Sequence, residues 1–274
     1  DLREFIKDNH LDLSLDGSFN PRHVFGSHSD ADHTYNTPRA WFMGRYLNPK
    51  TYKWEGEDAD YRPDSDDIPW SFIPEKKITV EDVKYTLSSY FQGTEYNCYG
   101  KHGDLSKRGM FRPIGINRNS VLELTQLRPY ASEKYRAIEW IALGSNAFNA
   151  FVPFYANIDK TPEYFANTTD KVSTENFYWA NRLIGALADA QFALCASHIE
   201  RYQASLAIAA FHVIHEYDKK LKDEKLSKEQ AIKLQEEANE EIAKIAKEQT
   251  DQVLGNVLFE VSCAMKNGFS RSDA

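Results

Sequence analysis

The second half of the chain is dominated by two long stretches of helical periodicity. Residues 177–217 contain one glycine and no proline, and their apolar positions cover much of a helix circumference. Residues 231–266 have a narrower apolar stripe and follow a capping box at Ser227–Gln230. The pattern predicts two long helices forming a hairpin around residues 219–226. The first should be buried on most sides, including at Leu194, Ile208 and Phe211.

Three short apolar runs precede these helices and predict strands. Residues 120–128 alternate with period two, residues 138–143 are apolar between charged and glycine positions, and residues 150–155 are aromatic. Pro153 interrupts the third run, which favours an edge strand. Strands this close together along the chain indicate an antiparallel sheet, so the predicted fold class is α+β.

The remaining pattern predicts shorter helices separated by loops. Residues 2–9 are amphipathic, Thr37 and Pro38 resemble a hydroxyl cap followed by proline in the first turn, and Thr79 begins a capping box for a helix to about Phe91. Residues 48–74 are rich in Asp, Pro and Tyr and predict a long surface loop. All ten prolines precede residue 166, so we expect an α+β portion over 1–165 and a helical portion over 166–274.

Composition restricts the classes of partner. The 33 basic and 41 acidic residues give a formal charge of −8, which offers no broad basic face for nucleic acid. No apolar stretch is long enough to span a bilayer, so we expect no membrane partner. Three cysteines without metal-type spacing favour a reducing cytoplasm. Cys195 and Cys263 lie within apolar helical patterns and are expected in the core, whereas Cys98 lies in a glycine-flanked loop.

The densest group of chemically active residues lies between Phe25 and Trp41. His28, Asp30, Asp32 and His33 are suitable metal ligands, but they lack the spacing of two ligands one helical turn apart, and a hydrogen-bonded turn is the stronger interpretation. The stretch that begins at Asp12 imitates half of a calcium loop. Its twelfth position is His23 rather than the required Glu, which argues against calcium.

Arg39 is the sharpest candidate for a functional role. A cation in the first turn of a helix is disfavoured by the helix dipole, by up to about 1 kcal/mol, so its presence there suggests an anionic partner. That partner is either a structural carboxylate such as Asp30 or Asp32, or a substrate or nucleophile positioned by the guanidinium. Cys98 is a weaker candidate, as a nucleophile whose nearest histidine in sequence is His102.

Four segments carry a resemblance to a known family. They are FGSHSDADHTYNTPRAW, PWSFIPEKKITVEDVKYTLSSYFQGTEYN, FRPIGINRNSVLELTQLRP and AFVPFYAN. In order and approximate spacing they resemble the cysteine dipeptidases of the N-terminal-nucleophile hydrolase superfamily. These are the PepD-type peptidases related to penicillin V acylase and bile salt hydrolase. The resemblance implies part of a four-layer αββα sandwich with a long C-terminal helical hairpin.

The resemblance also implies a mechanism and a set of residues. In such enzymes an N-terminal Cys attacks the peptide carbonyl with its own α-amino group as base. Arg39 would be the catalytic arginine at the rim of a cleft, with Asn36 and Tyr35 as substrate-binding neighbours, and no cofactor or metal is needed. Asp1 is not such a nucleophile, so we expect the Cys to lie in an N-terminal segment or chain outside this sequence, and this polypeptide alone to be inactive.

Two rival interpretations remain at this point. The helical hairpin could be the assembly module of a non-catalytic interaction protein, and its partly apolar second helix suggests a homo-oligomer. A metal-dependent hydrolase using the His28–His33 cluster is the other rival. The leading prediction is the C-terminal part of a cytoplasmic cysteine dipeptidase acting on dipeptide substrates.

Overall fold

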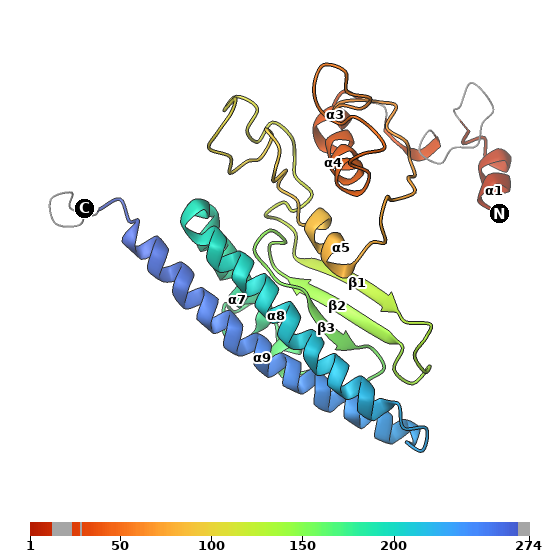
Figure 1. Ribbon diagram of the computed structural model, residues 1–274, viewed down its shortest axis with the longest axis vertical. Helices are drawn as coiled ribbons and strands as arrows, with labels where there is room; N and C mark the ends of the chain where they lie inside the picture. The colour runs from red at the N-terminus through yellow and green to blue at the C-terminus, as the bar shows by residue number, and fades with distance from the viewer. Residues whose placement is uncertain (13–23, 28, 268–274) are drawn as a thin grey trace. The chain divides into compact units, whose positions relative to one another are not determined.

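The computed structural model describes residues 1–12, 24–27 and 29–267, which form two compact units. The first unit spans residues 1–114 and the second spans 115–274. The boundary expected near residue 165 therefore falls inside the second unit. Mixed helix and sheet agree with the predicted α+β class (Figure 1).

In the first unit, four helices have described bounds. They are α1 (Leu2–Asp8), α3 (Asp32–Tyr35), α4 (Thr37–Leu47) and α5 (Val80–Leu87). Long loops separate all of them except α3 and α4. The capping box at Thr79 and Asp82 is confirmed. The hydroxyl cap is wrong, because Thr37 lies inside α4 and the N-cap residue is Asn36, which makes no side-chain capping bond.

The helix predicted to reach Phe91 ends at Leu87 instead. Phe91 has a φ of 62°, in the left-handed region, and its side chain is fully buried. Its ring meets that of Phe42 edge to face at 5.8 Å. The chain therefore leaves the helix in order to place this ring in the core, and tertiary packing overrides the local helical preference.

Residues 48–74 form a loop, as predicted, but it is not merely a surface loop. Trp54 and Ile68 are 5% and 2% exposed and join the core formed by Trp41, Phe42 and Phe91. The Trp41 indole N–H donates to the backbone oxygens of Trp54 (3.1 Å) and Tyr61 (3.2 Å). These bonds fix the loop against α4 and satisfy backbone groups that no strand or helix partners.

The second unit contains the sheet and the long helices. Its strands are β1 (Val121–Leu127), β2 (Ala137–Leu143) and β3 (Val152–Tyr155), and its helices are α6 (Glu163–Ala166), α7 (Phe177–Ala190), α8 (Phe192–Leu221) and α9 (Lys228–Cys263). The sheet is antiparallel in the order β1-β2-β3, with Leu124 opposite Trp140 and Glu139 opposite Phe154. The predicted edge position of the proline-containing strand is therefore confirmed.

The helical hairpin is confirmed, but its first arm is broken. The α8 and α9 helices run antiparallel side by side, and the capping box at Ser227 begins α9 (Figure 1). The single helix predicted over 177–217 is two helices, because Gln191 leaves helical geometry with φ −131° and ψ 44°. Neither glycine nor proline marks this break, so the sequence pattern did not reveal it.

Some positions expected in the core are exposed. Ile208 and Phe211 are 71% and 51% exposed and Leu194 is 45% exposed, whereas Leu206 and Ile199 of the same helix are buried. Cys195 is buried as predicted, but Cys263 is exposed near the end of α9. Only one side of α8 is therefore covered, although its apolar residues extend around more of the helix.

A polar network fastens the sheet to this hairpin. The Tyr155 hydroxyl donates to Asp218 Oδ1 (2.8 Å), and Arg128 forms a two-point ion pair with the same carboxylate (2.5 and 3.1 Å). The Asn239 side chain on α9 exchanges two hydrogen bonds with the Tyr155 backbone (2.9 and 3.0 Å). Asn239 thereby satisfies the Tyr155 backbone N–H and C=O at the edge of the sheet, as a neighbouring strand would.

Gly44 provides a test of the packing between α4 and the loop. A Cβ at this position would collide with the indole ring of Trp54. We expect Gly44→Ala to lower the free energy of unfolding by about 1–3 kcal/mol, because overpacking outweighs the gain in helix propensity. Urea denaturation of the full-length protein that carries this sequence measures the effect.

The matched control is Gly255→Ala in α9, where no atom lies within 4 Å of the added Cβ. It should be neutral or stabilising by up to about 1 kcal/mol. Equal effects of the two substitutions would contradict the packing described here.

Candidate functional site

The candidate site is at the N-terminal end of α4, which follows α3 after a single residue, Asn36. Asp32 accepts hydrogen bonds from the Ser27 hydroxyl (2.8 Å), from the Ser29 backbone (3.1 Å) and from the Asn36 side-chain amide. This carboxylate orders the turn before α4. The hydrogen-bonded-turn interpretation of the cluster agrees with these contacts.

The other candidate metal ligands do not gather around Asp32. His33 Nε2 lies 2.9 Å from Oδ1 of Asp66, a largely exposed carboxylate that raises the pKa of His33 by accepting its hydrogen bond. Asp30 is exposed, and His28 lies outside the described residues. Within the described ranges, no three His, Cys, Asp or Glu side chains come together as metal ligands would. The calcium-like stretch lies mostly outside those ranges.

Arg39 is half-buried and held by a backbone carbonyl. Its Nε donates to the backbone oxygen of Arg112 at 3.2 Å. Burial lowers its pKa, and the positive charge of Arg112 lowers it further. In the described part of the chain no carboxylate lies within 4.0 Å of the Arg39 guanidinium, so the expected structural ion pair with Asp30 or Asp32 does not form there.

Tyr35 and Asn36 differ in what they offer a ligand. The Tyr35 ring is 46% exposed, and the Arg112 guanidinium carbon lies 5.7 Å from its centre, a cation–π contact. Asn36 instead turns its amide toward Asp32. The structure therefore brings Tyr35 and Arg39 together around Arg112, while Asn36 supports the turn.

Arg112 was not singled out by sequence reasoning. It lies in the FRPIGINRNS segment, far from Arg39 in sequence, and reaches the site because its backbone N–H donates to the Thr34 oxygen at 3.1 Å. Its Nε is buried and has no hydrogen-bond partner among the described residues. No local motif signals this placement, since it depends on a loop returning to α3.

A large cavity lies on a different side of α4. It has a volume of about 740 Å³, and its walls include the aromatic rings of Trp41, Trp54, Tyr96 and Phe111. Residues two apart in a helix point about 200° apart, so Trp41 faces away from Arg39, which does not line this cavity. Cys98 does not line it either and is partly buried.

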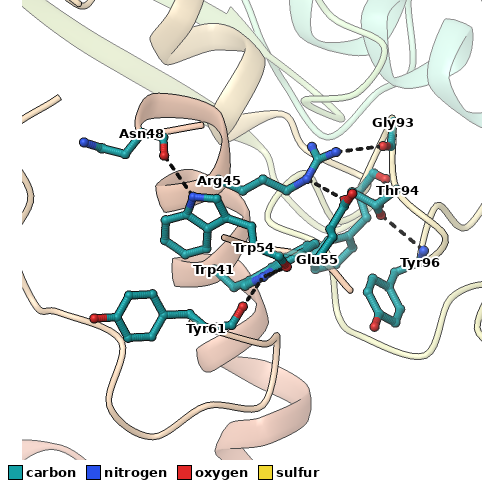
Figure 2. A network of polar contacts seen from close by, with 10 residues as sticks. Trp41, Arg45, Asn48, Trp54, Glu55, Tyr61, Gly93, Thr94 and Tyr96 are labelled. Carbon is teal, nitrogen blue, oxygen red and sulfur yellow. Dashed lines mark hydrogen bonds and ion pairs between the residues drawn. The ribbon is translucent and has the colours of Figure 1, made fainter. Parts of the chain in front are cut away.

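Ion pairs and backbone bonds shape the rim of this cavity (Figure 2). Arg45 Nε donates to Glu55 (2.7 Å) and its Nη2 to the Gly93 oxygen (3.2 Å), while Lys107 pairs with Glu95 at 2.9 Å. The Trp54 indole donates to the Asn48 oxygen at 2.9 Å. Glu55 and Glu95 are thus ion-paired, and the cavity is lined by both aromatic and charged side chains.

A buried carboxylate fixes α4 relative to α5. The Tyr46 hydroxyl donates to Asp82 Oδ1 at 2.6 Å, and Lys76 donates to the same oxygen at 2.8 Å. Burial disfavours the charged form of Asp82, but these bonds and those from Thr79 outweigh it and hold its pKa well below the usual range. Burial, followed by the hydrogen bond to Asp82, raises the pKa of Tyr46 to about 12.

Residues 1–205 match the family model of Peptidase family C69. The chain is 45% identical to "Dipeptidase" of Bifidobacterium longum (strain NCC 2705), with 100% of the chain and 58% of that protein covered. It is 42% identical to "Probable dipeptidase A" of Streptococcus pyogenes serotype M18 (strain MGAS8232), covering 100% and 55%. It is 32% identical to "Dipeptidase A" of Lactobacillus helveticus, covering 95% and 52%.

The chain therefore spans little more than half the length of these relatives. Among the helices of the described ranges, none combines the length and the hydropathy needed to cross a bilayer.

The Asp82 network predicts a dependence of stability on pH. A carboxyl group whose pKa is lower in the folded than in the unfolded protein stabilises the fold above its unfolded value, near 3.9, and loses that effect as the pH falls. We expect the wild-type protein to lose more stability between pH 5 and pH 3 than Asp82→Asn does, as measured by urea denaturation.

Asp58→Asn, which changes an exposed carboxylate of the same unit, is the control and should follow the wild type. The same loss of stability in Asp82→Asn and wild type would show that Asp82 does not contribute to acid sensitivity.

Proposed function

Because the chain belongs to Peptidase family C69, we propose that it is part of a dipeptidase that cleaves dipeptides by cysteine chemistry. The relatives named as dipeptidases align over the whole chain or nearly so, which supports this activity. The environment of Arg39 supports its assignment to the active site. Arg39 is half-buried, held at one end, and without a carboxylate partner among the described residues.

The proposed reaction is acyl transfer to an N-terminal Cys that is not among these 274 residues. The sulfur attacks the carbonyl carbon of the dipeptide, and the α-amino group of the same Cys accepts the thiol proton. The C–N bond then breaks, and that proton passes to the departing amine. Water attacks the resulting thioester, releasing the first amino acid and restoring the thiol.

Arg39 is suited to stabilise negative charge in this reaction. Its Nε is already bound to the Arg112 carbonyl, so the plane of the guanidinium is fixed before substrate arrives. The two Nη groups make no hydrogen bond to other described residues. A fixed donor in a partly desolvated position stabilises a developing oxyanion better than a mobile one, because little reorganisation is needed.

The cytoplasm is the proposed location. The chain has only three cysteines, without metal-type spacing, which supports a reducing compartment.

The test is hydrolysis of a neutral dipeptide by the full-length protein that carries this sequence. We expect Arg39→Met to lower kcat/KM by at least about 100-fold, the loss typical of removing one oxyanion donor. Arg39→Lys should recover little, since an ammonium lacks the planar fork. Iodoacetamide should abolish turnover if a thiolate is the nucleophile.

Arg118→Met, which removes an exposed arginine, is the control and should retain full activity. Activity of Arg39→Met within threefold of wild type would remove Arg39 from the mechanism and leave the dipeptidase assignment intact. Absence of dipeptide hydrolysis by the wild-type protein would overturn the assignment itself.

A further inference from the structure

We propose that Arg112 binds the free C-terminal carboxylate of the dipeptide and selects for it, next to the oxyanion-stabilising Arg39. This inference rests on the proposed function and identifies the group that restricts the enzyme to short substrates. It starts from two arginines that the fold brings together, with no carboxylate of the described residues beside either guanidinium.

The first step is the contact between the two arginines. Arg39 Nε donates to the Arg112 backbone oxygen at 3.2 Å, and the Arg112 backbone is itself fixed by its bond to Thr34. Burial is the larger cause of the lowered pKa of Arg39, and the positive charge of Arg112 lowers that pKa further. Two permanently charged groups therefore lie near each other on fixed backbone segments.

The second step is the missing counter-charge. No carboxylate of the described residues lies within 4.0 Å of either guanidinium. The nearby Asp32 is occupied by Ser27, Ser29 and the Asn36 amide, and Asp66 pairs with His33. Like charges held together in a partly buried place are destabilising unless an anion joins them.

The third step is the orientation of Arg112. Its guanidinium stacks on the half-exposed Tyr35 ring, 5.7 Å from the ring centre, and in the described part of the chain its buried Nε has no hydrogen-bond partner. Stacking on an aromatic ring restricts the side chain and leaves donors in the guanidinium plane for a planar acceptor. A carboxylate is the planar, bidentate anion that fits this geometry.

The fourth step is the size of the substrate. In a dipeptide the free carboxylate carbon is three bonds from the carbonyl carbon that is attacked, a distance under about 4.3 Å from standard bond lengths. A site that recognises both groups must therefore place its carboxylate-binding cation next to the cation that serves the oxyanion. Arg112 is such a neighbour of Arg39, because the Arg39 guanidinium is bonded to the Arg112 backbone.

The experiment compares a neutral dipeptide with its C-terminal amide in the full-length protein. The wild type should prefer the free acid, and Arg112→Met should raise KM for the acid at least tenfold while changing kcat little. The ratio of kcat/KM between acid and amide should fall toward one in this variant. Arg112→Lys should restore part of the preference, because it keeps the charge and loses the fork.

Arg118→Met again serves as the control and should keep the wild-type ratio. Isothermal titration with both compounds, on protein whose turnover iodoacetamide has abolished, separates this inference from the proposed function, because it reports binding alone. Tighter binding of the acid that is lost in Arg112→Met would support the carboxylate site even if no hydrolysis occurs. An acid-to-amide ratio in Arg112→Met equal to that of the wild type, in kinetics and in binding alike, would overturn the inference. This holds even if the variant is less stable than the wild type, because both compounds are measured on the same protein.

Discussion

The indole of Trp41 is the contact on which the first unit depends most. This unit has short helices, and no strand is present among its described residues, so its long loops cannot satisfy their backbone groups by pairing in a sheet. Trp41 supplies both an apolar surface and one donor shared between two carbonyls of the 48–74 loop. Because the ring is 1% exposed, its bonds form where water does not compete. The loop and α4 are thereby held as one packed body, and Arg39 is carried on that helix.

Most elements were predictable where a local signal existed. The capping boxes at Thr79 and Ser227, the alternation of β1 and the proline of β3 all act within a few residues, and the structure agrees with each. The break at Gln191 and the left-handed Phe91 depend on contacts with distant segments, and no residue type announces them.

The candidate site shows the same division. Arg39 was found because a cation in a first helical turn breaks a local rule, and such violations often mark function. Arg112 obeys every local rule and becomes notable only when the loop brings it beside Tyr35. Asn36 appeared to be a pocket residue from its position in the motif, whereas its amide is bound to Asp32. Sequence reasoning predicted Arg39 as a candidate, and the contact between Arg39 and Arg112 is visible only in the structure.

The proximity of Arg39 and Arg112 has a consequence for the protein in solution. Most surface ion pairs weaken as ionic strength rises, since salt screens attraction. Here the charge of Arg112 repels that of Arg39, in addition to the larger effect of burial, and salt screens this repulsion over a Debye length of about 8 Å at physiological ionic strength. Without a ligand, the region around Arg39 and Arg112 should therefore become more stable, not less, when electrolyte is added. Small carboxylate buffers should enhance the effect beyond what chloride produces.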